Sequence, residues 1–226
     1  MGWIEFAVAM AVFMASHRIP AMLGVKDALV ARLGARGYLA VFSLLSLGLL
    51  WWVIAAAGRA PYVELWEQTR AARWGVNVVM PVAGLLTVLG VGAINPFAFE
   101  GRGKGFYPER PGIAGVTRQP LLWALLLWSG AHLWANGDVA HVVLFGVFAV
   151  FSLAGMAIVE RRRRGAMGEP KWKALTRHTS LVPFAALLSG RGRPLRLPSG
   201  RVLLGALAWA VLWHLHGPVI GVVPVP

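Results

Sequence analysis

Five of the six histidines stand among the few polar side chains in the apolar parts of this sequence, and one of them, His132, lies deep inside an apolar segment. In a helix over this segment, Trp128 would lie one turn before His132 and Asn136 one turn after it, so that all three share a face. An ionisable side chain within a membrane helix is costly, and it usually faces the bundle interior or a cavity. Because haem iron accepts histidine as an axial ligand, His132, Trp128 and Asn136 are candidate cofactor-binding residues. A single hydrogen bond between helices would also explain the histidine.

Other histidines could supply a second ligand to the same metal ion. His17 lies near the end of the first apolar segment, and His214 and His216 lie two residues apart in the last one, so that only one of that pair can face inward. Counted by the helical rise from the basic end of each segment, His132 and His216 lie at almost the same depth, about 21 Å. Two axial ligands of one iron must lie only about 4 Å apart along the iron axis. Depth therefore favours His132 with His216 over His132 with His17.

The elements that must position these side chains are transmembrane helices. Hydrophobic residues make up 58% of the 226 residues, and the mean hydropathy is +0.64. Several apolar runs approach the roughly 20 residues that cross a bilayer as a helix. We therefore expect an all-α, polytopic membrane bundle that forms a single domain over residues 1–226. The six expected spans cover residues 2–23, 37–57, 75–94, 119–136, 138–159 and 201–217. The shorter apolar stretch from Leu181 to Leu188 predicts an interfacial or re-entrant helix.

The charges predict how this bundle lies in its membrane. The net charge is +13, and 19 of the 22 basic residues fall in the connections after the first, third and fifth spans or in the ends of the spans beside them. Basic loops stay in the cytoplasm, so both termini are expected on the periplasmic side of a bacterial inner membrane. Basic loops on the cytoplasmic side can contact the anionic headgroups of the lipid bilayer, and this accounts for the high net charge. No nucleic-acid partner is therefore expected. The absence of cysteine excludes disulfides and cysteine-ligated metal centres.

A second candidate site lies at the cytoplasmic ends of the fourth and fifth spans. The short turn between these spans makes them an antiparallel hairpin, which brings Arg118 and Glu160 to within the packing distance of two helices, about 8–10 Å. Arg161 follows directly, and Arg177 can fold back beneath them. An unpaired carboxylate there would be costly, so Glu160 is expected to pair with an arginine. The cluster is then either a structural ion-pair network or an anion-binding part of a cofactor site.

Four motifs in this chain resemble those of a known family of membrane proteins. They are "ASHRIP", "GVTRQPLLWALLLWSGAHLWANGD", "KWKALTRHTSLVPFAALLSGR" and "HLHGPVIGVVPVP". They resemble the NnrU family, which also includes the plant zeta-carotene isomerase branch. The resemblance implies a protein of six or seven spans linked to nitric oxide and nitrite metabolism, with a respiratory or denitrification complex as a possible kind of partner. The isomerase branch implies haem b and the isomerisation of a cis double bond in a lipophilic small molecule. By motif, His17 and His132 match its proposed haem histidines and His216 matches a histidine near its C-terminus, so the resemblance favours His17 as the partner of His132.

The chain departs from this resemblance at two places. Gln119 stands where the family commonly has histidine in a Thr-Arg-His-Pro motif, and the second external loop lacks the histidine of the isomerase branch. Carotene isomerisation is therefore a weaker expectation than haem binding. The pattern around Arg118, Glu160, Arg161 and Arg177 is also similar to isoprenylcysteine-type methyltransferases, which implies S-adenosylmethionine as the alternative cofactor. A cofactor-free accessory protein is the third possibility.

Overall fold

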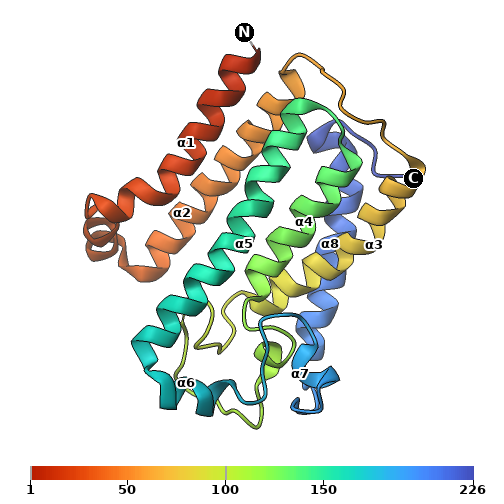
Figure 1. Ribbon diagram of the computed structural model, residues 1–226. Helices are drawn as coiled ribbons and strands as arrows, with labels where there is room; N and C mark the ends of the chain where they lie inside the picture. The colour runs from red at the N-terminus through yellow and green to blue at the C-terminus, as the bar shows by residue number, and fades with distance from the viewer. Residues whose placement is uncertain (1, 100) are drawn as a thin grey trace. The chain divides into compact units, whose positions relative to one another are not determined.

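The computed structural model describes residues 2–99 and 101–226, and it describes residues 18–22 by their backbone alone. Throughout this part of the chain the regular structure is helical, apart from two isolated β-bridges, which confirms the all-α prediction. The helices are α1 (Gly2–Met22), α2 (Val25–Arg59), α3 (Arg70–Gly90), the 3₁₀ helix η1 (Gly112–Gly115), α4 (Pro120–Ala135), α5 (Val139–Met167), α6 (Glu169–Thr176), α7 (Ala185–Leu188) and α8 (Ser199–Ile220) (Figure 1).

Some of these helices can span a membrane. Four helices, α2, α3, α5 and α8, are long and apolar enough to cross a membrane. The apolar stretches Gly2–His17 of α1 and Pro120–Ala135 of α4 are shorter. The protein is therefore a helical membrane protein with several spans, while the expected number of six and the expected orientation stay predictions.

Two helices extend well beyond the spans expected from hydropathy. α2 begins at Val25 rather than near residue 37, with a kink at Gly34, whose φ of 71° and ψ of 164° are not helical. Glycine permits this backbone because it has no Cβ. α5 continues to Met167 rather than ending near residue 159, because the arginines that follow the apolar part are themselves good helix formers.

The chain divides into two compact units, and the first comprises Met1–Glu67 and Asn136–Leu144. In this unit α1 packs against α2. The Glu5 carboxylate accepts hydrogen bonds from the Arg59 guanidinium, at 3.1 Å for Nε, and from the indole of Trp52, at 3.3 Å. The buried apolar side chains of the pair are Phe6, Ala9, Phe13, Val53, Ala56 and Ala57.

A close backbone approach connects the two parts of the first unit. The amide of Leu65 donates to the carbonyl of Gly137 at 2.6 Å, and the amide of Val139 donates to the carbonyl of Val63 at 2.9 Å. A Cβ added to Gly137 would collide with the carbonyl of Trp66. Glycine is therefore required in the short connection between α4 and α5.

The second unit comprises Gln68–Ala135 and Phe145–Pro226, and it contains α3, α4, most of α5, and α6 to α8. Here α3 packs against both α4 and α8. Small residues permit these approaches, since a Cβ on Gly75 would overlap the Trp134 ring and one on Gly205 would lie 2.8 Å from Leu85. The core between them is formed by Leu86, Leu89, Ile113, Val116 and Ala124.

The long loops of the second unit meet where most of the basic residues lie, and we call the region formed by residues 91–119 and 160–201 the basic end. The hydroxyl of Thr117 donates to the carbonyl of Leu181 at 2.7 Å, and the amide of Phe184 donates to the carbonyl of Val116 at 2.8 Å. These contacts hold residues 181–184 in bends and a turn beside the start of α4. The helix predicted over residues 181–188 is therefore wrong except for its last four residues, which form α7.

Candidate functional site

Two histidines from different helices face each other in the second unit. The imidazole of His132 on α4 and that of His216 on α8 have ring centres 6.5 Å apart, and their planes meet at 26°. Each metal–nitrogen bond of an axial pair is about 2 Å, and with about 1 Å from nitrogen to ring centre the two centres would lie about 6 Å apart. The observed separation of the ring centres is close to this value. It agrees with the depth argument that favours His216 as the partner of His132.

Hydrogen bonds define which ring nitrogen of each histidine is basic. Nδ1 of His132 lies 2.8 Å from the carbonyl oxygen of Trp128, and Nδ1 of His216 lies 2.6 Å from that of Val222. A carbonyl only accepts, so both Nδ1 atoms carry the proton and both Nε2 atoms are the basic nitrogens. Such a bond also orients an imidazole toward a metal. His214 bonds the carbonyl of Ala210 in the same way, so this tautomer alone does not identify a ligand.

Aromatic side chains surround His132. The Trp128 and Phe145 rings lie 5.5 Å and 5.1 Å from its ring, and Phe145 and Phe148 pack edge-on against Trp128. Trp128 is thus beside His132, as the helical spacing predicts. Asn136 follows the end of α4 and belongs to the first unit. Its role in cofactor binding stays a prediction.

His17 lies in the first unit, on α1. Its Nδ1 is 2.8 Å from the carbonyl of Phe13, and its ring lies 4.4 Å from that of Phe13 and 5.3 Å from that of Phe42. Because His17 and His132 belong to different units, their pairing as axial ligands stays a prediction.

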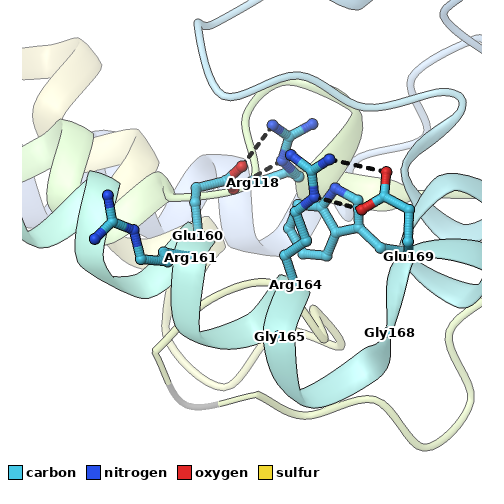
Figure 2. Close-up of a pocket in the computed structure, with 8 residues that line it drawn as sticks. Arg118, Glu160, Arg161, Arg164, Gly165, Gly168 and Glu169 are labelled. Carbon is cyan, nitrogen blue, oxygen red and sulfur yellow. Dashed lines mark hydrogen bonds and ion pairs between the residues drawn. The ribbon is translucent and has the colours of Figure 1, made fainter.

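At the basic end, Arg118 and Glu160 form the ion pair that the hairpin predicts. The guanidinium donates two parallel hydrogen bonds to the carboxylate, at 2.8 Å from Nε and 2.7 Å from Nη2 (Figure 2). The two side chains are only 14% and 17% exposed. Arg118 also lies over the Trp172 ring at 5.5 Å and donates to the Thr179 carbonyl at 3.3 Å. The polar atoms of this pair are therefore largely satisfied by the protein itself.

A cavity of about 630 Å³ borders this ion pair. A second bidentate pair, Arg164 with Glu169, closes another side at 2.6 Å and 2.8 Å, while Arg161 extends away from both pairs (Figure 2). The residues around the cavity are Arg118, Glu160, Arg161, Arg164, Gly165, Gly168, Glu169 and Trp172. Three of the four residues predicted for this site therefore come together here.

Arg177, the fourth predicted residue, is engaged elsewhere at the basic end. It pairs with Glu109, which also accepts from Arg193 and lies 3.2 Å from Nε2 of His178. The hydrogen bond from Arg193 is the main reason why the pKa of the Glu109 carboxyl lies below its ordinary value. Sequence reasoning missed Glu109 because its partners are 68 to 84 residues away in loops without any periodic pattern.

Gln119, which stands where the related motif has histidine, is fully buried in the same region. Its Nε2 donates to the carbonyl of Phe97 at 2.8 Å, while Asn95 donates to the carbonyl of Arg118 at 2.9 Å. Among the described residues, the Oε1 atom of Gln119 has no hydrogen-bond partner. Position 119 therefore anchors the loop that follows α3 to the start of α4.

Comparisons with known proteins show which proteins this chain is similar to. A family model described as NnrU protein matches residues 5–224. The chain is 35% identical over 81 residues to the "15-cis-zeta-carotene isomerase, chloroplastic" proteins of Zea mays and of Arabidopsis thaliana. Each of these matches covers 35% of this chain and 22% of the plant protein. No solved structure matches the chain.

Proposed function

This chain belongs to the NnrU family, and we propose that it is a haem-binding membrane protein in which His132 and His216 would hold haem b. The main observation that supports this proposal is the pair of imidazoles from α4 and α8, whose ring centres lie 6.5 Å apart. Their Nδ1–H groups are held by backbone carbonyls, which leaves each Nε2 as the metal-binding nitrogen. Bound haem would supply a redox-active iron whose potential depends on its axial ligands and surroundings.

The residues around His216 suggest how a reactant reaches this site. Leu212 and Leu215 on α8 are 64% and 47% exposed, as is normal for side chains that face lipid. A lipophilic small molecule dissolved in the bilayer would therefore approach along an apolar helix surface. We propose isomerisation of a cis double bond in such a molecule as one activity, supported by the similarity to the plant isomerases. A role in nitric oxide or nitrite metabolism beside a respiratory or denitrification complex, in a bacterial inner membrane, is the other.

The methyltransferase alternative rests on the cavity beside Arg118 and Glu160. Such an enzyme would need these side chains to hold S-adenosylmethionine. Arg118 and Glu160 already satisfy each other through two hydrogen bonds, and a ligand carboxylate would have to displace Glu160. The geometry therefore supports a structural role for the pair more than a cofactor site.

The test of haem binding is the visible spectrum and haem content of the purified protein. The wild type, produced with adequate haem supply, should contain about one haem per chain with the split reduced bands of bis-histidine ligation. His132→Ala and His216→Ala should lose most of the haem or change to a high-spin spectrum. His214→Ala is the matched control, because His214 lies two residues away on the same helix, is exposed, and should retain the haem.

Three outcomes would change the assignment. Loss of haem in His17→Ala together with retention in His216→Ala would replace the pair by His17 and His132. Unchanged spectra in all of these variants would exclude histidine ligation. A wild-type protein that stays free of haem after reconstitution would favour the cofactor-free accessory role.

A further inference from the structure

A second cavity of the basic end has an unbalanced charge. It has a volume of about 390 Å³ and lies between the end of α3, the loop before η1 and the start of α8. Three arginines border it, Arg110, Arg196 and Arg201, and none of its lining residues is acidic. In the larger cavity beside Arg118, by contrast, two of three arginines are neutralised by glutamates. The smaller cavity is therefore the stronger attractor for an anion.

Two of these arginines keep their full hydrogen-bonding capacity. Arg201 is engaged, because its Nη1 donates to the carbonyl of Val91 at 3.0 Å and so caps the end of α3. Within the described chain, the guanidinium groups of Arg110 and Arg196 make no hydrogen bond or ion pair. Each therefore offers a planar fork of donors, which matches the geometry of a phosphate group.

The other walls of the cavity are apolar. Leu89 and Ile113 are buried there as part of the core of the second unit, and Leu197 packs against the same cluster. Phe106 and Ile94 complete this side, and Ile94 is 51% exposed. Cationic groups beside an apolar surface fit an amphiphile better than a fully hydrated ion.

The cavity also lies at one end of two helices that can cross a membrane. α3 and α8 are both long and apolar enough to cross a membrane, and the cavity lies where α3 ends and α8 begins. Basic pockets between transmembrane helices are known to bind anionic headgroups. We propose that this cavity binds the phosphate of an anionic membrane lipid, with Arg110 and Arg196 as the donors and the first acyl carbons against Leu89, Ile94 and Leu197.

The experiment measures binding of phosphatidylglycerol to the purified full chain in detergent by native mass spectrometry, with phosphatidylcholine as the reference lipid. Each cation near a charged membrane surface contributes about 1 kcal/mol, so Arg110→Ala and Arg196→Ala should each weaken phosphatidylglycerol binding about fivefold. Binding of phosphatidylcholine should not change. Arg162→Ala is the matched control, since it removes one charge from an arginine that does not border the cavity. It should change the affinity less than twofold.

Two further arms separate a lipid site from a free phosphate site and from diffuse surface charge. Glycerol 3-phosphate and inorganic phosphate carry the anion without acyl chains, and both should compete only weakly. Equally tight binding of either would overturn the lipid assignment in favour of a free phosphate site. If Arg162→Ala lost as much affinity for phosphatidylglycerol as the two cavity variants, the cavity would not be the binding site, and the binding would be due to diffuse surface charge. Unchanged melting temperatures would show that the variants remain folded, because neither Arg110 nor Arg196 holds another described residue through its side chain.

Discussion

Replacing Arg118 by methionine removes one half of a nearly buried ion pair and leaves the Glu160 carboxylate without its two strongest hydrogen bonds. With side chains 14% and 17% exposed, the pair has little access to water that could replace the lost guanidinium. Breaking a fully buried pair costs about 3–5 kcal/mol, and the residual exposure here lowers the expected loss of unfolding free energy to about 2–4 kcal/mol. In a chain of this length that loss corresponds to a fall of about 5–10 °C in melting temperature.

The same cavity provides a matched control for this variant. Arg164 and Glu169 form a pair with the same two parallel hydrogen bonds, but their side chains are 57% and 42% exposed. Exposed pairs contribute little because water and salt screen them. Arg164→Met should therefore lower the melting temperature by less than about 2 °C. The double variant Arg118→Met/Glu160→Met should recover much of the loss, because it leaves no unpaired charge behind.

The assay is thermal unfolding in detergent, followed by tryptophan fluorescence, with and without S-adenosylmethionine. Equal shifts for Arg118→Met and Arg164→Met would refute the claim that burial makes the first pair important. S-adenosylmethionine could raise the melting temperature of the wild type but not that of Arg118→Met. This result would show that the cluster around Arg118 is a cofactor site rather than a structural ion pair. The haem content of Arg118→Met should equal that of the wild type, since neither histidine of the proposed pair contacts Arg118.

Three other predictions concern separate features. The basic partners of Glu109 lower the pKa of its carboxyl, so the ionised carboxylate stabilises the fold at pH values above its ordinary pKa. This contribution is lost as the pH falls through the lowered pKa. The melting temperature should therefore fall with acidification, and it should fall less in Glu109→Gln. Gly137→Ala should strongly reduce the yield of folded protein, measured by size-exclusion chromatography, because its Cβ collides with a main-chain carbonyl, whereas Gly146→Ala has open space and should be tolerated. A cysteine introduced by Arg162→Cys should react with membrane-impermeant maleimide only from the cytoplasmic side, and labelling from the periplasm would reverse the expected orientation.

Hydropathy alone could predict that the protein is helical and where most of its apolar segments lie. It could not predict where α2 begins and where α5 ends, because these boundaries depend on glycine conformation and helix propensity outside the membrane rather than on burial in lipid. The early start of α2 with its kink at Gly34 and the continuation of α5 through its arginines both show this. The six expected membrane crossings stay a prediction, because α4 is only 16 residues long and is shorter than the helices that meet the length of a span.

Contacts between candidate residues were predictable where a regular helix fixes their spacing. The pairing of Arg118 with Glu160 follows from the short turn between α4 and α5, and the proximity of His132 to His216 follows from their equal depth along two helices. The contacts of Glu109 could not be predicted in this way. They join irregular segments, and their geometry depends on tertiary packing that no local pattern encodes.

The ion pairs divide the arginines of the basic end into two groups. Paired arginines carry an unpaired charge only during membrane insertion, whereas unpaired arginines carry it in the folded protein as well. While the chain inserts into a membrane, no tertiary pair has formed, and every arginine in these loops would favour retention on one side, which we expect to be the cytoplasmic side. After folding, three glutamates pair with Arg118, Arg164, Arg177 and Arg193, whereas Arg110 and Arg196 keep no side-chain partner within the described chain. Substituting a paired arginine should therefore disturb stability more than lipid attraction, and substituting Arg110 or Arg196 should do the reverse.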